Sequence, residues 1–185
     1  MEDLQTEYQK RQTLYDTMIV NSQSVIAAVK RKTDLMLSNK DRYLAIAHTF
    51  PNPCLTWDIV CTIHEMECTQ NFNKYLGNGQ NLDQVTTIVP AGRGPFATFE
   101  DGAIDALNLQ LESHPFTDCS IGGKLYWLEG YNGYGYENYH HINSPYLWSG
   151  SQWYIKGKYT SDGQFDPEAV SQQIGVALLL KSLLT

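Results

Sequence analysis

Residues 57–72 read WDIVCTIHEMECTQNF, and this stretch decides the fold that we expect. Its apolar side chains spread over most of the circumference of a helix, which predicts a helix buried on several sides. They include Ile59, Val60, Ile63 and Met66. Thr56 is a candidate N-cap just before the helix. Glu67 then lies near the C-terminal end, where the helix dipole disfavours a negative charge and raises the pKa of a carboxyl group.

Glu67 is the candidate catalytic residue of this helix. Aromatic residues flank the helix, and a segment rich in Gly and Asn follows it from Tyr75 onward. A carboxylic acid in a partly apolar cleft at such a junction can act as a general acid near neutral pH. Glu65 lies about 200° away around the helix, so only one of the two acids can face a given cleft. A salt-bridged or solvated Glu67 is the alternative that periodicity alone favours.

Length and composition predict one globular domain over residues 1–185, with disorder allowed for residues 1–11. Hydrophobic residues make up 42% of the chain and charged residues 18%, which is ordinary for a folded domain. The net charge of −7 argues against a nucleic-acid partner. No apolar run is long enough for a membrane-spanning helix, and the polar start lacks a signal-peptide core. We expect a monomer made in the cytoplasm.

The four cysteines do not make a disulfide framework in a chain of this size, so we expect buried thiols. Cys61, His64 and Cys68 share one helix face at a spacing that resembles a metal site. Structural zinc sites draw ligands from two elements, however, and no second ligand pair is evident. A Cys68 nucleophile with His64 as its base is a further alternative. We expect no metal and no cofactor.

Helical periodicity and caps predict most of the other elements. Helices are expected over residues 12–32 and 34–48, from Thr98 to Leu109, from Thr117 to about Glu129, and from Asp166 to Leu184. Between them, residues 75–96 contain the turn Gly77–Gly79 and a strand-like run from Val85 to Val89, which predicts a small hairpin or an irregular β-flap. The predicted fold class is mainly α with this small β element.

Residues 129–136 read EGYNGYGY and form the second unusual segment. Tyrosine rings alternate with Gly and Asn, which gives ring platforms, amide donors and accessible backbone. This chemistry suits N-acetyl groups and sugar hydroxyls. A glycine-rich turn whose tyrosines seal the core explains the same pattern equally well.

Several motifs occur together in order along the chain. They are Ile63-His64-x-x-Glu67, Asn71-Phe72, Asn78-Gly79, Val89 to Arg93, Pro95-Phe96-x-x-x-Glu100, Asp105 to Leu107, Glu129 to Tyr136, Ser144 to Ser149, and Lys156 to Tyr159. With these motifs the chain resembles phage and bacterial lysozyme-like endolysins, a group related to goose-type lysozymes and soluble lytic transglycosylases. The resemblance extends from about Leu14 to the C-terminus.

The resemblance implies a lysozyme-like helical domain whose small β element lies beside an active-site cleft. It implies cleavage of the MurNAc-β-1,4-GlcNAc bond of peptidoglycan glycan strands, with Glu67 as the general acid. Tyr131 and Asn132 match the Tyr-Asn motif that lines the cleft and orients the acid and the acetamido sugar. His64 is a further candidate for substrate binding. The natural route to the cell wall would be phage-type release through a membrane lesion.

This chain departs from the family pattern at two places. Cys68 stands where a serine commonly follows the acid, and Gln80 stands where an aspartate commonly follows Asn78-Gly79. If Gln80 occupies that position, Asp83 could replace the second carboxylate, or amides and hydroxyls such as those of Thr86 and Thr87 could position water. The alternatives are therefore hydrolysis, lytic transglycosylation that needs no second carboxylate, and a catalytically inactive glycan-binding or virion module.

Overall fold

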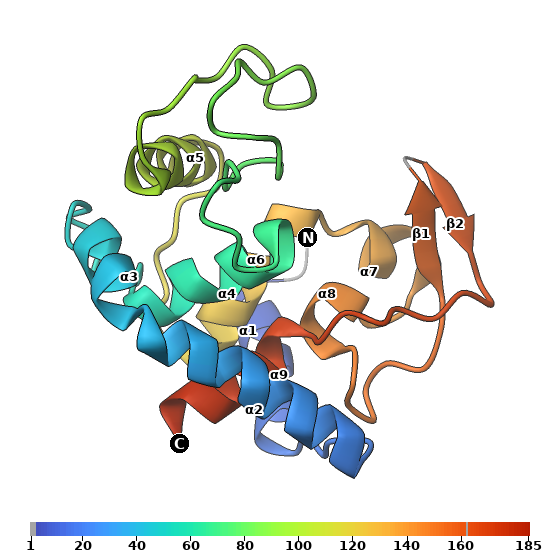
Figure 1. Cartoon of the computed structure of the whole chain (residues 1–185). Helices are drawn as coiled ribbons and strands as arrows, with labels where there is room; N and C mark the ends of the chain where they lie inside the picture. The colour runs from blue at the N-terminus through green and yellow to red at the C-terminus, as the bar shows by residue number, and fades with distance from the viewer. Residues whose placement is uncertain (1–2, 162) are drawn as a thin grey trace. The chain divides into compact units, whose positions relative to one another are not determined.

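The computed structural model describes residues 3–161 and 163–185. This part of the chain is mainly helical, with 52% helix in nine helices, and carries one small two-stranded antiparallel sheet (Figure 1). The predicted class, mainly α with a small β element, is confirmed. None of the described helices is both long and apolar enough to cross a bilayer.

The chain divides into two compact units. The central unit comprises residues 35–117, and the terminal unit comprises the chain up to Asp34 together with residues 118–185. Each unit has its own buried apolar side chains. The single domain expected over residues 1–185 stays a prediction.

The terminal unit contains most of the helices and the sheet. Helix α1 (Leu4–Asp16) packs on α6 (Ile121–Asn132), and α8 (Pro145–Trp148) packs on both α6 and α9 (Val176–Leu184). Fully buried Leu125, Leu128, Leu147 and Leu179 form the core of these contacts. The remaining elements are α2 (Gln23–Ser38, whose last turn belongs to the central unit), α7 (Gly135–His140), β1 (Lys158–Ser161) and β2 (Gln164–Asp166).

In the central unit, α4 (Trp57–Cys68) packs against α3 (Lys40–Ala47), and α3 also contacts α5 (Phe99–Ser113). The prediction of α4 is confirmed, although the Thr56 side chain makes no capping hydrogen bond. The helix ends at Cys68 because Thr69 and Gln70 both take positive φ angles, 49° and 58°. The capped start of α5 is also confirmed, since the Thr98 hydroxyl accepts a 3.1 Å hydrogen bond from the Asp101 amide.

The helix expected over residues 12–32 is wrong, because two helices, α1 and α2, replace it. The chain leaves the helix after Asp16 and pairs with the segment 150–152. Val20 forms a β-bridge with Ser151, and the backbone amide of Asn21 donates to the Gly150 carbonyl at 3.0 Å. Tertiary hydrogen bonds thus override the helical periodicity. Disorder of residues 1–11 is not seen from Leu4 onward, where α1 begins; residues 1 and 2 lie outside the described part.

The strand expected over Val85–Val89 is also wrong. Residues 83–89 form no strand, and Val85, Ile88 and Val89 are 49%, 54% and 88% exposed, so the apolar side chains of this run have no buried face that would favour sheet pairing. Of the two forms predicted for residues 75–96, a small hairpin or an irregular flap, the structure has the irregular flap. The hairpin instead joins β1 to β2, with Tyr159 opposite Phe165. Asp166 ends β2, so the last helix begins ten residues later than expected, at Val176.

Helices α1 and α6 pack closely at Gly122, and this contact gives a first prediction. A Cβ atom there would overlap the backbone carbonyl oxygen of Tyr8. Overpacking of this kind costs about 1–3 kcal/mol, although Gly to Ala inside a helix otherwise gains about 0.5–1 kcal/mol. We therefore expect Gly122→Ala to lower the free energy of unfolding measured by urea denaturation.

Gly130→Ala is the matched control in the same helix, because the atoms nearest to its Cβ belong to the Tyr134 side chain and none of them is a backbone atom. Equal or higher stability of Gly122→Ala relative to this control would refute the close packing of α1 on α6.

Candidate functional site

Helix α4 presents a single accessible carboxylate. From Asp58 to Cys68 every side chain is buried except that of Glu67, which is partly exposed. The neighbouring acid, Glu65, is only 2% exposed and accepts a 2.7 Å hydrogen bond from the Gln70 side chain. The burial predicted for this helix is therefore observed, and it leaves Glu67 as its one acid open to solvent.

The turn of the flap packs against the end of α4. Gly79 has φ +71°, and a Cβ atom there would lie 2.9 Å from the backbone carbonyl oxygen of Glu67. A glycine is required at this position for both reasons. One residue further along α4, the Cys68 thiol donates to the Tyr75 carbonyl at 3.4 Å. The predicted junction between helix and flap thus lies at Glu67.

Gln80 and Thr86 hold the flap together through their side chains. The Gln80 side-chain carbonyl accepts hydrogen bonds from the amides of Thr87 (2.8 Å) and Ile88 (3.1 Å). The buried Thr86 hydroxyl donates to the Pro90 carbonyl at 2.6 Å and accepts from the Arg93 amide at 2.9 Å. Both groups replace the ladder hydrogen bonds that a strand would supply. Their contact with a substrate stays a prediction.

An ion pair ties the flap to α5. The Arg93 guanidinium donates to the Asp105 carboxylate, with Nε at 3.0 Å, and the Tyr75 hydroxyl donates to the same carboxylate at 2.8 Å. Partial burial raises the pKa of Asp105, but these hydrogen bonds outweigh it and hold the pKa below its ordinary value. Two of the sequence motifs, around Arg93 and Asp105, are therefore joined in space.

Asp83 is exposed and lies in a groove of about 630 Å³ in the central unit. The walls of this groove include Phe72, Phe96 and the pair Arg42–Glu100, whose Nε–Oε1 distance is 2.6 Å. Glu67 is not among the residues that line it. A role for Asp83 as the second carboxylate stays a prediction.

His64 lies in the core and not on a surface. Its side chain is fully buried, with Nδ1 2.9 Å from the Tyr43 hydroxyl and ring centroids 4.6 Å from Phe72 and 4.2 Å from Phe99. Burial lowers the pKa of His64 to about 4, so the imidazole is neutral at neutral pH. Because the His64 side chain has no exposed surface, it cannot make the direct substrate contact that the sequence suggested.

The cysteines form two classes. Burial and then the nearby Glu67 charge raise the pKa of Cys68 to about 12, and burial also raises that of Cys61. Both are protonated at neutral pH, which disfavours a Cys68 nucleophile. The expectation of four thiols is wrong, since Cys54 and Cys119 are disulfide-bonded. Within residues 3–161 and 163–185, no cluster of three or more His, Cys, Asp or Glu side chains could hold a metal.

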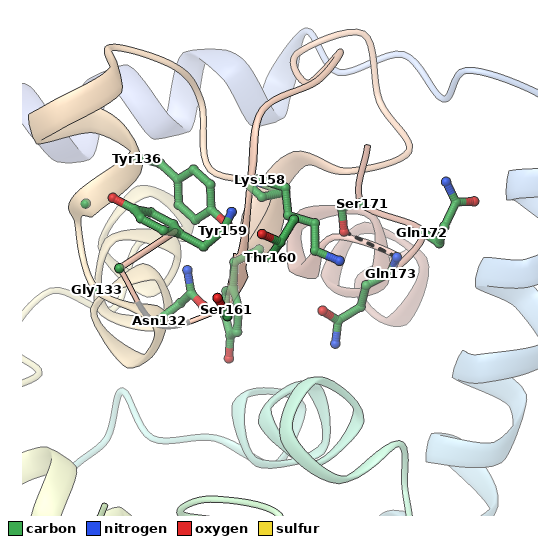
Figure 2. Close-up of a pocket in the computed structure, with 14 residues that line it drawn as sticks. Asn132, Gly133, Tyr136, Lys158, Tyr159, Thr160, Ser161, Ser171, Gln172 and Gln173 are labelled. Carbon is green, nitrogen blue, oxygen red and sulfur yellow. Dashed lines mark hydrogen bonds between the residues drawn. The ribbon is translucent and has the colours of Figure 1, made fainter. Parts of the chain in front are cut away.

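Tyr131 and Asn132, the other predicted site residues, end helix α6 in the terminal unit. The Tyr131 ring stands edge-on to Trp127 with centroids 6.2 Å apart. Asn132 is exposed and lines a groove of about 740 Å³ (Figure 2). Glu67 belongs to the central unit, so the joint role that the resemblance gives these three residues stays a prediction.

A buried arginine fixes the loop that follows Tyr131. Arg11 is 3% exposed and donates to one oxygen of Glu129 from Nε (2.9 Å) and Nη2 (2.6 Å), and to Glu137 from Nη2 (2.9 Å). Burial raises the pKa of Glu129, and the Arg11 charge opposes that rise. Sequence reasoning missed Arg11; the one available signal was Glu7 four residues earlier, which also pairs with it.

Comparison of this chain with protein-family models, curated proteins and solved structures found no match.

The burial of His64 predicts a pH-dependent stability. Because the folded pKa, about 4, lies below the ordinary value of 6.5, the unfolded state takes up more protons between these values. The contribution of neutral His64 to the free energy of unfolding is complete above pH 6.5. It is lost as the pH falls toward 4, by roughly 3 kcal/mol in total. We expect His64→Gln to flatten the fall in unfolding free energy between pH 6.5 and 4.

His48→Gln removes an exposed imidazole and serves as the control. If the unfolding free energy of both variants falls between pH 6.5 and 4 as steeply as that of the unmodified protein, burial of neutral His64 is not the cause of the fall.

Proposed function

We propose that this protein is a muramidase that cleaves the MurNAc-β-1,4-GlcNAc bond of peptidoglycan, with Glu67 as the general acid. The observation that carries the proposal is the accessibility of Glu67: it is the one partly exposed side chain between Asp58 and Cys68 on an otherwise buried helix. A helix that buries its other two acids, Asp58 and Glu65, has a rigid frame from which to present a single proton donor.

In the proposed reaction, Glu67 donates its proton to the glycosidic oxygen as the C1–O bond of MurNAc breaks. The proposed step starts from the protonated acid, and two features of its position are of the kind that disfavour a negative charge. The residue lies at the C-terminal end of α4, where the helix dipole disfavours a negative charge. Its side chain is also partly withdrawn from water. The same group, once ionised, can take a proton from the attacking hydroxyl.

The attacking hydroxyl belongs either to water or to C6 of the substrate. Hydrolysis with inversion requires a base roughly 6.5–9.5 Å from the acid. Asp83 is the candidate in this chain, whereas Gln80 at the position of the family aspartate cannot accept a proton. Because Gln80 is engaged inside the flap, a lytic transglycosylase that uses Glu67 alone is the second candidate function.

Replacing the acid tests the proposal. We expect Glu67→Gln to lower the rate of turbidity loss of chloroform-treated Gram-negative cells by about 100-fold or more, since a general acid contributes about 10²–10⁴. The thermal unfolding midpoint should stay close to that of the unmodified protein, because the amide keeps the shape of the carboxyl group.

Glu112→Gln removes an exposed acid on α5 and is the matched control. Lysis by a correctly folded Glu67→Gln variant at the unmodified rate would end the proposal. Binding of the unmodified protein to sacculi without release of fragments would favour an inactive glycan-binding module.

The products distinguish the two reactions. We expect mass spectrometry of the released muropeptides to find reducing MurNAc ends, and Asp83→Asn to slow their release because the base is lost. Products that end in 1,6-anhydroMurNAc, formed as fast by Asp83→Asn as by the unmodified protein, would instead establish lytic transglycosylation.

A further inference from the structure

The groove of about 630 Å³ in the central unit combines aromatic rings with carboxylates, and all of its described lining residues belong to that unit. The aromatic and charged members of the lining are Arg42, Phe72, Asp83, Phe96, Phe99 and Glu100. Two carboxylates and one guanidinium give the described lining a net negative charge. The groove therefore has the chemistry of a site for an organic cation.

Backbone hydrogen bonds join three segments that line the groove. The Leu82 amide donates to the Asn73 carbonyl at 3.0 Å, and the Phe96 amide donates to the Leu82 carbonyl at 2.8 Å. The Phe96 ring stacks on Tyr75 with centroids 5.1 Å apart, and it stays partly exposed where it lines the groove. Asp83 follows Leu82 directly, so this carboxylate and the Phe96 ring come from paired segments. Such a preformed site loses little conformational entropy on binding.

Arg42 shows which cation these groups can hold. Its guanidinium carbon lies 3.8 Å from the centroid of the Phe72 ring, and its Nε donates to Glu100 at 2.6 Å. This hydrogen bond holds the pKa of Glu100 below its ordinary value, so the carboxylate is ionised at neutral pH. A planar guanidinium gains a cation–π contact from the ring and a charge-assisted hydrogen bond from the carboxylate.

Asp83 and Phe96 supply the same two groups a second time. Asp83 is exposed, and it forms no ion pair within residues 3–161 and 163–185. An anionic ligand is disfavoured here. The N-terminus of α5, which would otherwise attract one, is already capped by Thr98 and carries Glu100 and Asp101 in its first turn.

We propose that the part of this groove formed by Asp83 and Phe96 binds an arginine side chain of a basic polypeptide partner. The guanidinium donates to the Asp83 carboxylate and lies over the Phe96 ring. Arg42 makes the same two kinds of contact with Glu100 and Phe72. A groove of about 630 Å³ also has room for the backbone on either side of the arginine. The net charge of −7 favours the approach of a basic partner.

Titration of the full-length protein with the peptide acetyl-Gly-Arg-Gly-amide tests the proposal. The matched probe is the same peptide with citrulline, which keeps the shape of arginine but is neutral. We expect the arginine peptide to shift the backbone amide NMR signals of Asn73, Asp83 and Ala97, which line the groove. The citrulline peptide should bind about five- to tenfold more weakly, because it loses both the ion pair and the cation–π contact.

Two variants locate the site. Asp83→Asn should weaken binding of the arginine peptide about two- to fivefold, the value of an exposed ion pair. Phe96→Leu, which keeps an apolar side chain, should weaken it about twofold or more. Because Asp83 is exposed, Asp83→Asn keeps the test decisive if Phe96→Leu does not fold. Glu112→Gln removes one negative charge at an exposed position outside the groove and is the matched control.

Unchanged groove signals, or equal binding of the citrulline peptide, would overturn the proposal. Binding that Asp83→Asn leaves at full strength would overturn it as well. If Glu112→Gln weakens binding as much as Asp83→Asn does, the attraction is that of the whole acidic chain, and the proposed site is refuted. The titration involves no glycan cleavage, so its outcome is independent of the proposed function and of the base role proposed for Asp83.

Discussion

The constraint on which the central unit depends is the burial of α4. Its side chains from Asp58 to Met66 are withdrawn from water on every face, so the helix cannot shift or rotate without exposing apolar surface or opening the Glu65–Gln70 contact. The flap turn at Gly79 lies against the backbone carbonyl of Glu67. These contacts hold Glu67 in a fixed position. The proposed function uses this partly exposed carboxyl group as the general acid.

The terminal unit uses a different physical solution. Arg11 lies within a helix of otherwise polar character and meets three carboxylates, those of Glu7, Glu129 and Glu137. A charge removed from water in this way is tolerated only when it is paired and hydrogen-bonded, so the two ends of the loop 129–137 are tied to one group. The segment that the sequence offered as a sugar-binding platform or a glycine-rich turn is thereby held in one shape, and it joins the last turn of α6 to the start of α7.

The sequence was sufficient for features set by local chemistry: the buried helix α4, the Thr98-capped helix α5 and the mainly helical class. It failed where distant contacts decide the conformation. Hydrogen bonds to residues 150–152 break the helix expected over residues 12–32, and side chains such as Gln80 take the place of strand pairing in the flap. Of the candidate site residues, Glu67 and Asn132 are accessible as expected, whereas His64 belongs to the core because its aromatic neighbours, Phe72 and Phe99, come from separate segments.

The most direct test of the central claim is carbodiimide coupling of an amine to the accessible carboxyl groups, followed by peptide mass spectrometry and a lysis assay. The account predicts that Glu67 is modified while Glu65 is not, that lytic activity is lost in proportion to modification of Glu67, and that chitotetraose slows both. Full lytic activity after complete modification of Glu67 would contradict it.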